Sequence, residues 1–222
     1  RKLRRAIMQG DLRPGQKLVE ANLCRDLEIS RASLREALRA LAAERLIDLV
    51  PHRGPSVATL SNQDVEDIHD VWALLTGEAV HRHAEVATKD DLRALAKAFE
   101  QVKRVDESRT PFELLVATNV LFMSILSHCG NRLLLDVVIS LVSRINFLRA
   151  QALANPGWRA LYVNEIEQIV QAIQASNPGA ARLAVQRHVA SCCAAAKHAM
   201  ALQADQGGKR GRRTKAAASN AA

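Results

Sequence analysis

Three arginines recur at every fourth position of one short stretch, SRASLREALRALAAERLI, which begins at residue 30. They are Arg31, Arg35 and Arg39. Residues four apart share one flank of an α-helix, where like charges on adjacent turns repel each other by about 0.2–0.5 kcal/mol per pair. A planar guanidinium group can hydrogen-bond guanine O6 and N7 together, and it also binds phosphate. The row therefore indicates a surface for a polyanion, although the solvated flank of an ordinary helix would show the same spacing.

The opposite side of the same helix is apolar. Leu34, Leu38 and Leu41 follow the i, i+4, i+7 spacing of a buried helical face. Ser30 is a favourable N-cap, because its hydroxyl can accept a hydrogen bond from a free N–H group of the first turn. Ser33 lies in that first turn and could reach a phosphate or the edge of a base. We therefore expect a helix that is anchored by leucines and presents its arginines to solvent.

Positive charge is concentrated at the two ends of the chain. Of the formal net charge of +8, residues 1–60 contribute +5, residues 61–205 contribute −2 and residues 206–222 contribute +5. A basic segment of about 60 residues indicates a polyanionic partner. The last 17 residues, QGGKRGRRTKAAASNAA, are predicted to form a disordered basic tail because they lack apolar side chains large enough to form a core.

Residues 1–60 are predicted to form a winged helix-turn-helix. A short helix over Leu3–Gln9 ends at Gly10, a second helix covers Glu20–Glu28, and a tight turn leads into the arginine-bearing helix. Two short alternating stretches around a Pro/Gly loop then predict a β-hairpin. In this motif the second helix of the helix-turn-helix enters the major groove of DNA. The hairpin loop would offer three further residues to the DNA, namely His52, Arg53 and Gly54.

The rest of the chain is predicted to be helical, so the fold class is mostly α. Apolar residues make up 48% of the chain but aromatic residues only 3%, and capping or helix-breaking residues recur at intervals. Six helices with short loops predict an antiparallel bundle over residues 61–205. The expected ranges are 61–87, 88–107, a third helix from 111, then 133–154, 158–175 and 177–203.

The acidic residues of the helical region form no evident catalytic pair. They gather at expected helix starts, as in NQDVEDIHD and TKDD, where carboxylates complement the helix dipole. The low aromatic content also argues against an aromatic-lined catalytic pocket. We therefore expect no catalytic residues and no enzymatic activity.

Cysteine spacing and hydropathy indicate a cytoplasmic protein. Cys24, Cys129, Cys192 and Cys193 lack zinc-finger spacing and are read as reduced thiols. The first residues have no apolar core of a signal peptide. Residues 114–131 carry no fixed charge, but six polar side chains interrupt them. This stretch is therefore expected to be a buried helix of a bundle and not a membrane span.

The N-terminal segment also resembles a known family. GDLRPGQKLVEANLCRDLEISRASLREALRALAAERLIDLVPHRGPSVA resembles the DNA-binding domain of the GntR family of bacterial transcriptional regulators. The matching landmarks are Pro14, Gly15, Leu18, Glu20, Leu23, Leu27, Ser30, Arg31, Leu34–Leu38, Leu41, Leu46 and Gly54. The resemblance implies that Arg31 and Arg35 read the operator and that Gly54 belongs to the wing tip. Glu28 departs from the pattern, since this turn usually holds a glycine, and a positive φ there would cost about 1 kcal/mol.

The helical region resembles the FCD effector domain of FadR-like members of that family, over about residues 62–200. Many members hold a divalent metal there with one Asp and three His. The positions that correspond to this set are Asn119, Met123, Ile166 and His188. An amide and a thioether are poor ligands for such a cation and isoleucine is none, so one histidine remains. We therefore expect neither a metal nor another cofactor.

The same resemblance suggests where an effector would bind. Trp72 stands at about the place where related chains often have an arginine that faces the pocket. Arg144 and Arg149 are candidates for binding an acidic ligand, although both could equally be surface residues. We expect a small organic effector, held directly, among Trp72, Asn119, Met123, Arg144, Arg149, Ile166 and His188.

These observations favour a ligand-responsive transcriptional repressor. We expect it to bind a palindromic double-stranded operator as a homodimer, because one winged helix buries too little surface for tight specific binding. Two other functions remain open. A non-specific nucleic-acid-binding protein would use the two basic ends, and a small helical enzyme would need a nucleophile–base pair in the bundle.

Overall fold

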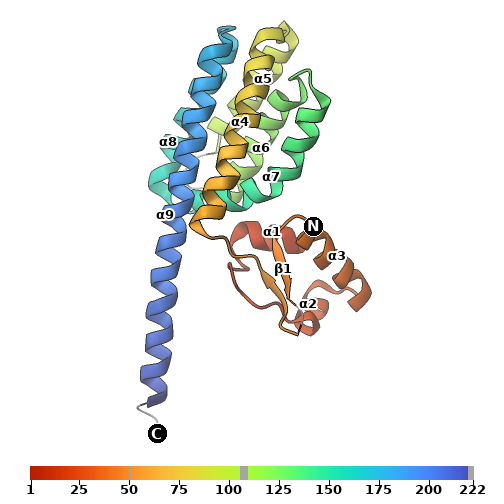
Figure 1. Ribbon diagram of the computed structural model, residues 1–222, viewed down its shortest axis with the longest axis vertical. Helices are drawn as coiled ribbons and strands as arrows, with labels where there is room; N and C mark the ends of the chain where they lie inside the picture. Colours follow the sequence, from red (N-terminus) through yellow and green to blue (C-terminus); the bar gives the residue numbers. More distant parts are fainter. Residues whose placement is uncertain (51, 106–109, 220–222) are drawn as a thin grey trace.

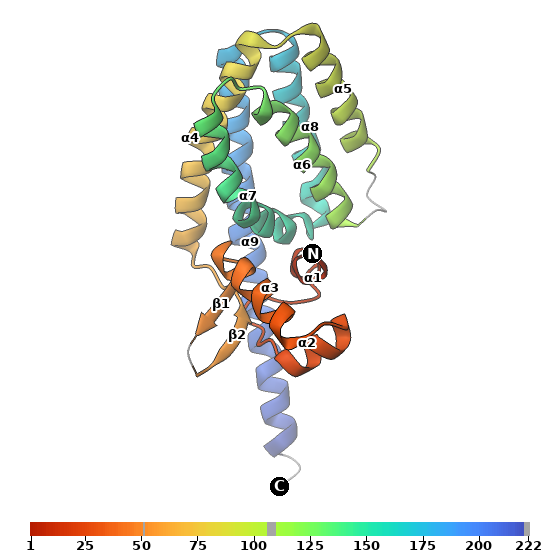
Figure 2. The same ribbon diagram turned by 90° about the vertical axis from the view of Figure 1, so that its right-hand side faces the viewer.

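The structure is a computed structural model that describes residues 1–50, 52–105 and 110–219, with side chains for all of these except 156 and 204–219. A small N-terminal part lies against one end of a taller group of helices (Figures 1 and 2). The first part is a winged helix-turn-helix and the second is a six-helix bundle. The prediction of a mostly α fold with this architecture is therefore confirmed.

The N-terminal part contains three helices and a hairpin. These are α1 (Lys2–Gln9), α2 (Glu20–Leu27), α3 (Arg31–Ala43), β1 (Ile47–Val50) and β2 (Gly54–Val57). The two strands pair antiparallel, with Ile47 opposite Val57 and Val50 opposite Gly54. The hairpin, residues 47–57, is called the wing below. The first strand agrees with the predicted stretch IDLV, whereas the second begins two residues earlier and ends three residues earlier than the predicted stretch SVATL at 56–60. Residue 51 lies outside the described residues.

The turn between α2 and α3 has the strained residue that the sequence predicts. Glu28 has φ 56° and ψ 44°, a left-handed conformation that usually favours glycine. Two residues later, the Ser30 hydroxyl accepts a hydrogen bond of 3.1 Å from the Ser33 backbone N–H. This cap fixes the start of α3, so the turn and the first residues of the arginine-bearing helix are held together.

Six helices form the bundle. They are α4 (Asn62–Val86), α5 (Lys89–Lys103), α6 (Pro111–Ser127), α7 (Arg132–Leu153), α8 (Pro156–Gln174) and α9 (Pro178–Ser219). Reciprocal capping boxes start three of them, pairing Ser61 with Asp64, Thr88 with Asp91 and Thr110 with Glu113. This explains why the acidic residues cluster at helix starts. α5 ends four residues earlier than predicted, and residues 106–109 lie outside the described residues.

The last helix is longer than predicted. α9 continues as helix to Ser219, whereas the sequence analysis predicted an end near Gln203 and a disordered tail over residues 206–222. The prediction was wrong for the backbone up to residue 219. The helix continues because lysine, arginine and alanine all favour helix and because no proline follows Pro178 in the sequence.

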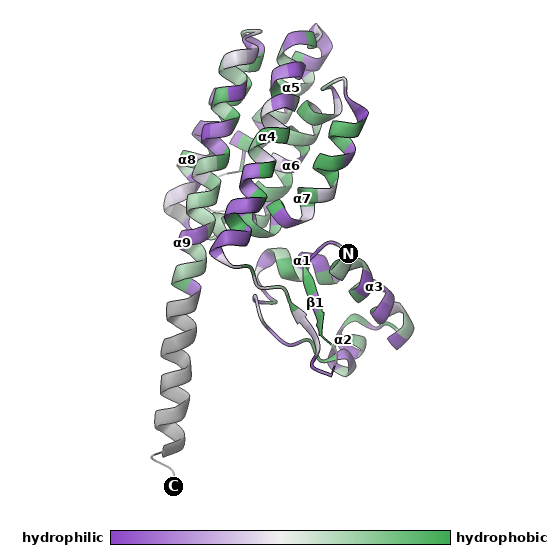
Figure 3. Cartoon of the chain, in the orientation of Figure 1, coloured by the Kyte–Doolittle hydropathy of each residue, from purple (hydrophilic) through white to green (hydrophobic). Residues whose placement is uncertain are grey.

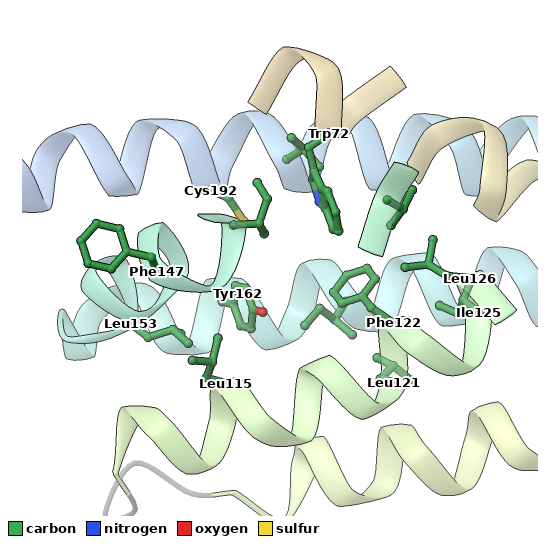
Figure 4. Close-up of a cluster of buried hydrophobic side chains, with 14 of the residues drawn as sticks. Trp72, Leu115, Leu121, Phe122, Ile125, Leu126, Phe147, Leu153, Tyr162 and Cys192 are labelled. Atoms are coloured by element: carbon green, nitrogen blue, oxygen red, sulfur yellow. The ribbon is translucent and has the colours of Figure 1, made fainter. Parts of the chain in front are cut away.

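The bundle core is apolar and extends to the small domain. α4 and α9 run side by side, and hydrophobic residues face inward between the helices (Figures 1 and 3). Trp72, Phe122, Tyr162 and Cys192 come from four different helices and meet at its centre (Figure 4). At the other end, α1 packs against α6 and α7. Movement of α1 is therefore coupled to the bundle.

A helix can cross a membrane only if it is long enough and apolar enough. Among the described residues, no helix is both long enough and apolar enough to span a membrane. The uncharged stretch noted in the sequence lies in α6, where seven residues are buried against neighbouring helices. Its apolar character is thus explained by the bundle core.

Candidate functional site

α3 presents the arginine row to solvent. Arg31, Arg35 and Arg39 are exposed, whereas the three leucines of the opposite face, Leu34, Leu38 and Leu41, are buried. The leucines thus hold the helix against the rest of the domain, and the arginine flank faces solvent. Figure 2 shows the position of α3 in the small domain. A flank of this kind can insert into a major groove without disturbing the core of the domain.

Arg35 is oriented by an acidic neighbour. Its Nε lies 3.3 Å from Glu20 Oε2, and the two side chains are 64% and 33% exposed. An exposed ion pair contributes about 0–1 kcal/mol to stability, so this contact chiefly restrains the direction of the guanidinium group. Ser33 is exposed as well, with its hydroxyl 3.0 Å from the Ser30 hydroxyl. Both residues remain predicted DNA contacts.

The wing tip is exposed and tightly turned. His52 has φ 63° and Gly54 has φ 75°, and the Arg53 backbone N–H donates to the Val50 carbonyl over 3.1 Å. All three predicted wing residues are exposed. The short turn projects Arg53 from the end of the hairpin, where it could reach a phosphate or a neighbouring groove.

A buried arginine lies inside the bundle. Arg149 is only 5% exposed, and its Nη1 donates to Asn119 Oδ1 over 3.3 Å and to Asn146 Oδ1 over 3.4 Å. Its guanidinium carbon lies 5.3 Å from the centre of the Phe122 ring. Its Nε is buried without a hydrogen-bond partner, and no carboxylate of the described residues pairs with it. The interior therefore holds a cation whose surroundings are neutral amides and an aromatic ring.

His188 lies on the other side of Phe122. Its Nδ1 lies 2.9 Å from Glu165 Oε2, and its Nε2 lies 3.5 Å from Cys192 Sγ. Burial alone would lower the pKa of His188, but the Cys192 sulfur and the Glu165 carboxylate outweigh it and raise that pKa to about 9. The imidazole is thus protonated at neutral pH, with both ring nitrogens engaged.

Two further groups complete the interior. His69 is buried, and its Nδ1 lies 2.7 Å from the Val65 carbonyl oxygen. Burial lowers the pKa of His69, and the positive charges of Arg149 and His188 lower it further. Burial also raises the pKa of Tyr162 to about 12. The Tyr162 hydroxyl forms no hydrogen bond within the described part of the chain, although Thr118 is close enough to lower that pKa slightly.

The structure brings only some of the predicted effector residues together. Asn119 and Arg149 are in direct contact, and His188 reaches them through the Phe122 ring. Trp72 and Ile166 are buried in the surrounding core, and Met123 packs against it. Arg144 is half-buried with an Nε that has no hydrogen-bond partner among the described residues.

The residues at the metal positions of related domains do not fit a metal. The Asn119 amide oxygen already accepts from Arg149, Ile166 has no donor atom, and both ring nitrogens of His188 are engaged by Glu165 and Cys192. Within the ranges that the structure describes, no three His, Cys, Asp or Glu side chains come together as a metal cluster. The chemistry of this donor set gives no basis for a metal-dependent step.

Metal content gives a direct check. Protein purified without an affinity tag is expected to contain much less than one equivalent of zinc, nickel or manganese by elemental analysis. Addition of EDTA should leave the melting temperature unchanged, because no closed shell of donors exists to be emptied. One equivalent of bound metal, together with a lower melting temperature after chelation, would refute this interpretation.

A small pocket reaches the surroundings of Arg149. It has a volume of about 230 Å³ and lies where α1 meets α6 and α7. Its polar lining consists of Arg1 at the start of α1, Arg4 and Arg5 from α1, Asn119 from α6, and Ser143 and Asn146 from α7. We call it the junction pocket. Its two asparagines are the residues that accept hydrogen bonds from Arg149, so the buried guanidinium lies directly behind its wall.

A larger cavity is a weaker candidate. It measures about 900 Å³ and lies between the end of α1, the following loop, and α6, α7 and α9. Its lining includes none of the predicted effector residues. The buried atom without a partner there is the neutral Gln151 Oε1, whereas Arg149 carries a full charge. Because an unpaired buried charge costs far more than an unpaired amide oxygen, we favour the junction pocket.

Sequence reasoning missed several residues of this site. Asn146 stands three positions before Arg149 on the same helical face, and that spacing could have identified it. Glu165 directly precedes Ile166, one of the predicted effector positions, and this adjacency is a second usable signal. Arg4 and Ser143 gave no such signal, since only the packing of α1 onto α7 brings them near Asn119.

Comparison with known families identifies both parts of the chain. Residues 1–57 match the family described as "Bacterial regulatory proteins, gntR family". Residues 67–191, more than half of the chain, match the family described as "FCD domain". These two segments coincide with the winged helix-turn-helix and with the bundle from α4 to α9.

Individual relatives agree with these matches. The chain is 25% identical over 201 residues to the uncharacterised HTH-type transcriptional regulator YdhC of Bacillus subtilis, covering 89% of each chain. It is 29% identical to the HTH-type transcriptional repressor GlaR of Escherichia coli, covering 66% of this chain and 70% of that protein. The solved structure of E. coli McbR/YncC has the same fold, with a TM-score of 0.74 and 19% identity over 89% of this chain and 94% of that one.

Proposed function

Since this chain belongs to the gntR family of bacterial regulatory proteins and carries an FCD domain, we propose that it is a homodimeric, cytoplasmic repressor whose operator affinity is set by a small carboxylate bound beside Arg149. The chain is a transcriptional regulator and not an enzyme. Repression is supported by the name of GlaR, and the palindromic operator by the symmetry argument below.

DNA recognition is assigned to α3 and the wing. The exposed row of Arg31, Arg35 and Arg39 would lie in the major groove, with His52, Arg53 and Gly54 on the adjoining backbone. A single winged helix buries too little surface for tight specific binding, so two copies related by a two-fold axis would read two half-sites. Their operator would accordingly be a palindrome.

Arg149 is the observation that carries the effector proposal. A guanidinium group that is 5% exposed and lacks a carboxylate partner is costly to bury, by several kcal/mol. A ligand carboxylate in the junction pocket, next to the two asparagines that accept hydrogen bonds from Arg149, would supply the missing negative charge. The buried Phe122 ring beside Arg149 favours an acid with a small apolar body. Asn119 and His188 would contact the ligand or orient the side chains that contact the ligand.

Footprinting with and without a carboxylate tests the proposal. We expect protection of two inverted half-sites whose centres lie about one helical turn, or a multiple of it, apart. Light scattering should give a mass of twice the 24.3 kDa of one chain. Butyrate, a monocarboxylate with an apolar body, should change operator affinity, whereas an equal concentration of chloride should not. Uniform coating of DNA without a protected palindrome would instead support the non-specific alternative.

A further inference from the structure

The junction pocket is positively charged where the two domains meet. Its lining includes Arg1, which precedes α1, and two arginines of α1, and among the described residues it includes no acidic side chain. Arg5 is partly occupied, since its Nε donates to Gln9 over 3.2 Å and its guanidinium lies 5.3 Å from the centre of the Phe112 ring. Arginine side chains thus line the pocket on the side of α1, and the buried Arg149 lies behind Asn119 and Asn146 on the side of α6 and α7.

Glu44 neutralises Arg4, one of the arginines that line the pocket. It is the C-cap residue of α3, and its carboxylate forms an ion pair with Arg4 of α1. The same carboxylate accepts a hydrogen bond of 2.7 Å from the Ser143 hydroxyl of α7. Arg4 and Ser143 both line the pocket, whereas Glu44 does not. The end of the helix that carries the arginine row is therefore held to α1 through Arg4 and to the effector bundle through Ser143.

We propose that a carboxylate in the junction pocket competes with Glu44 for Arg4 and thereby releases the end of α3 from α1. The ligand would lie between Arg4 and the wall formed by Asn119 and Asn146, with Arg149 behind it. A pocket of 230 Å³ limits the ligand to a small acid, since drug-sized ligands occupy about 300–1,000 Å³. This inference rests on the proposed function and adds to it how binding is transmitted to the DNA-binding helix.

The link works because one guanidinium cannot satisfy two carboxylates equally. When the ligand takes Arg4, Glu44 loses its charged partner on α1 and keeps only the neutral Ser143 hydroxyl. The end of α3 is then held by a weaker, neutral hydrogen bond and is freer to move relative to α1. A ligand shifts a two-state equilibrium only by its difference in affinity for the two states, and Arg4 provides that difference here.

Two substitutions that break the same ion pair separate the inference from a merely structural role. Calorimetry would measure butyrate binding to the full-length protein in a buffer of constant ionic strength. Arg4→Gln removes a ligand contact and is expected to weaken butyrate binding about tenfold or more, the loss of one charge-assisted hydrogen bond. Glu44→Gln removes the competitor and is expected to strengthen it about threefold to tenfold. Lys2→Gln, an exposed neighbour on α1 outside the pocket, should leave it unchanged.

Operator binding supplies the second readout. Without butyrate, Glu44→Gln should change operator affinity in the same direction as saturating butyrate changes it in the wild-type protein. If Arg4→Gln and Glu44→Gln shift butyrate affinity in the same direction, or if neither shifts it, the competition is refuted. In that case the proposed function still stands, provided that butyrate binds and depends on Arg149. If butyrate does not bind the wild-type protein at all, both proposals fail.

Discussion

Replacing Arg35 with alanine is expected to weaken operator binding by about 1–3 kcal/mol and to flatten the preference at one base pair in each half-site. Arg35 lies one turn into α3, is 64% exposed, and is held beside α2 by Glu20. It is thus oriented before DNA arrives, so less side-chain entropy is lost when it binds a base. Titration of the operator and of single-base variants would measure both effects.

Arg39 provides the matched comparison for Arg35. It belongs to the same exposed row but lies one turn further from the start of α3, the end that enters the groove first. Arg39→Ala should therefore weaken binding to all sequences by a similar factor, as the loss of one phosphate contact does. If Arg35→Ala leaves both affinity and base preference unchanged, the assignment of Arg35 as a base-reading residue is wrong.

Local features of the fold could be predicted because they depend on nearby residues. Ser30, Ser61 and Thr88 were readable as helix caps, since each can accept a hydrogen bond from an N–H three positions later. The left-handed conformation of Glu28 was implied by the family resemblance, because a glycine usually stands at this place in the turn. The end of α9 was missed because a basic, glycine-containing segment satisfies the composition of a tail while its lysines, arginines and alanines favour helix.

Contacts between distant residues could not be predicted in this way. Glu44 and Ser143 are 99 positions apart, and Asn119 and Arg149 are 30 apart. Neither pair has a regular spacing along the sequence, because the packing of whole helices against each other determines which of these side chains meet. The sequence named Arg149 as a candidate for an acidic ligand but left it equally compatible with a surface position. Its burial excludes the surface position.

Replacing Arg149 with methionine is expected to abolish the response to butyrate while leaving the protein at least as stable as the wild type. The substitution removes the buried cation that lies behind the asparagine wall of the junction pocket, so a bound carboxylate loses its compensating charge, and we expect a loss of affinity of roughly 30-fold or more, about 2 kcal/mol. The stability, in contrast, should not fall. Methionine has a similar length and no charge, so it removes an uncompensated cation from the core. Asn119 and Asn146, which lose their donor, line the junction pocket and can bind water instead.

Arg144→Met is the control for this experiment. Arg144 lies on the same helix and also has a buried Nε without a partner among the described residues, but the hydrogen bonds to the pocket residues Asn119 and Asn146 come from Arg149. The two substitutions remove the same charge from α7, so a general electrostatic effect would appear in both. Calorimetry should show loss of butyrate binding only in Arg149→Met, and thermal unfolding should show that this variant melts no lower than the wild type. A marked fall in its melting temperature would mean that Arg149 is a structural residue satisfied by its amides, and the carboxylate site would then have to lie elsewhere.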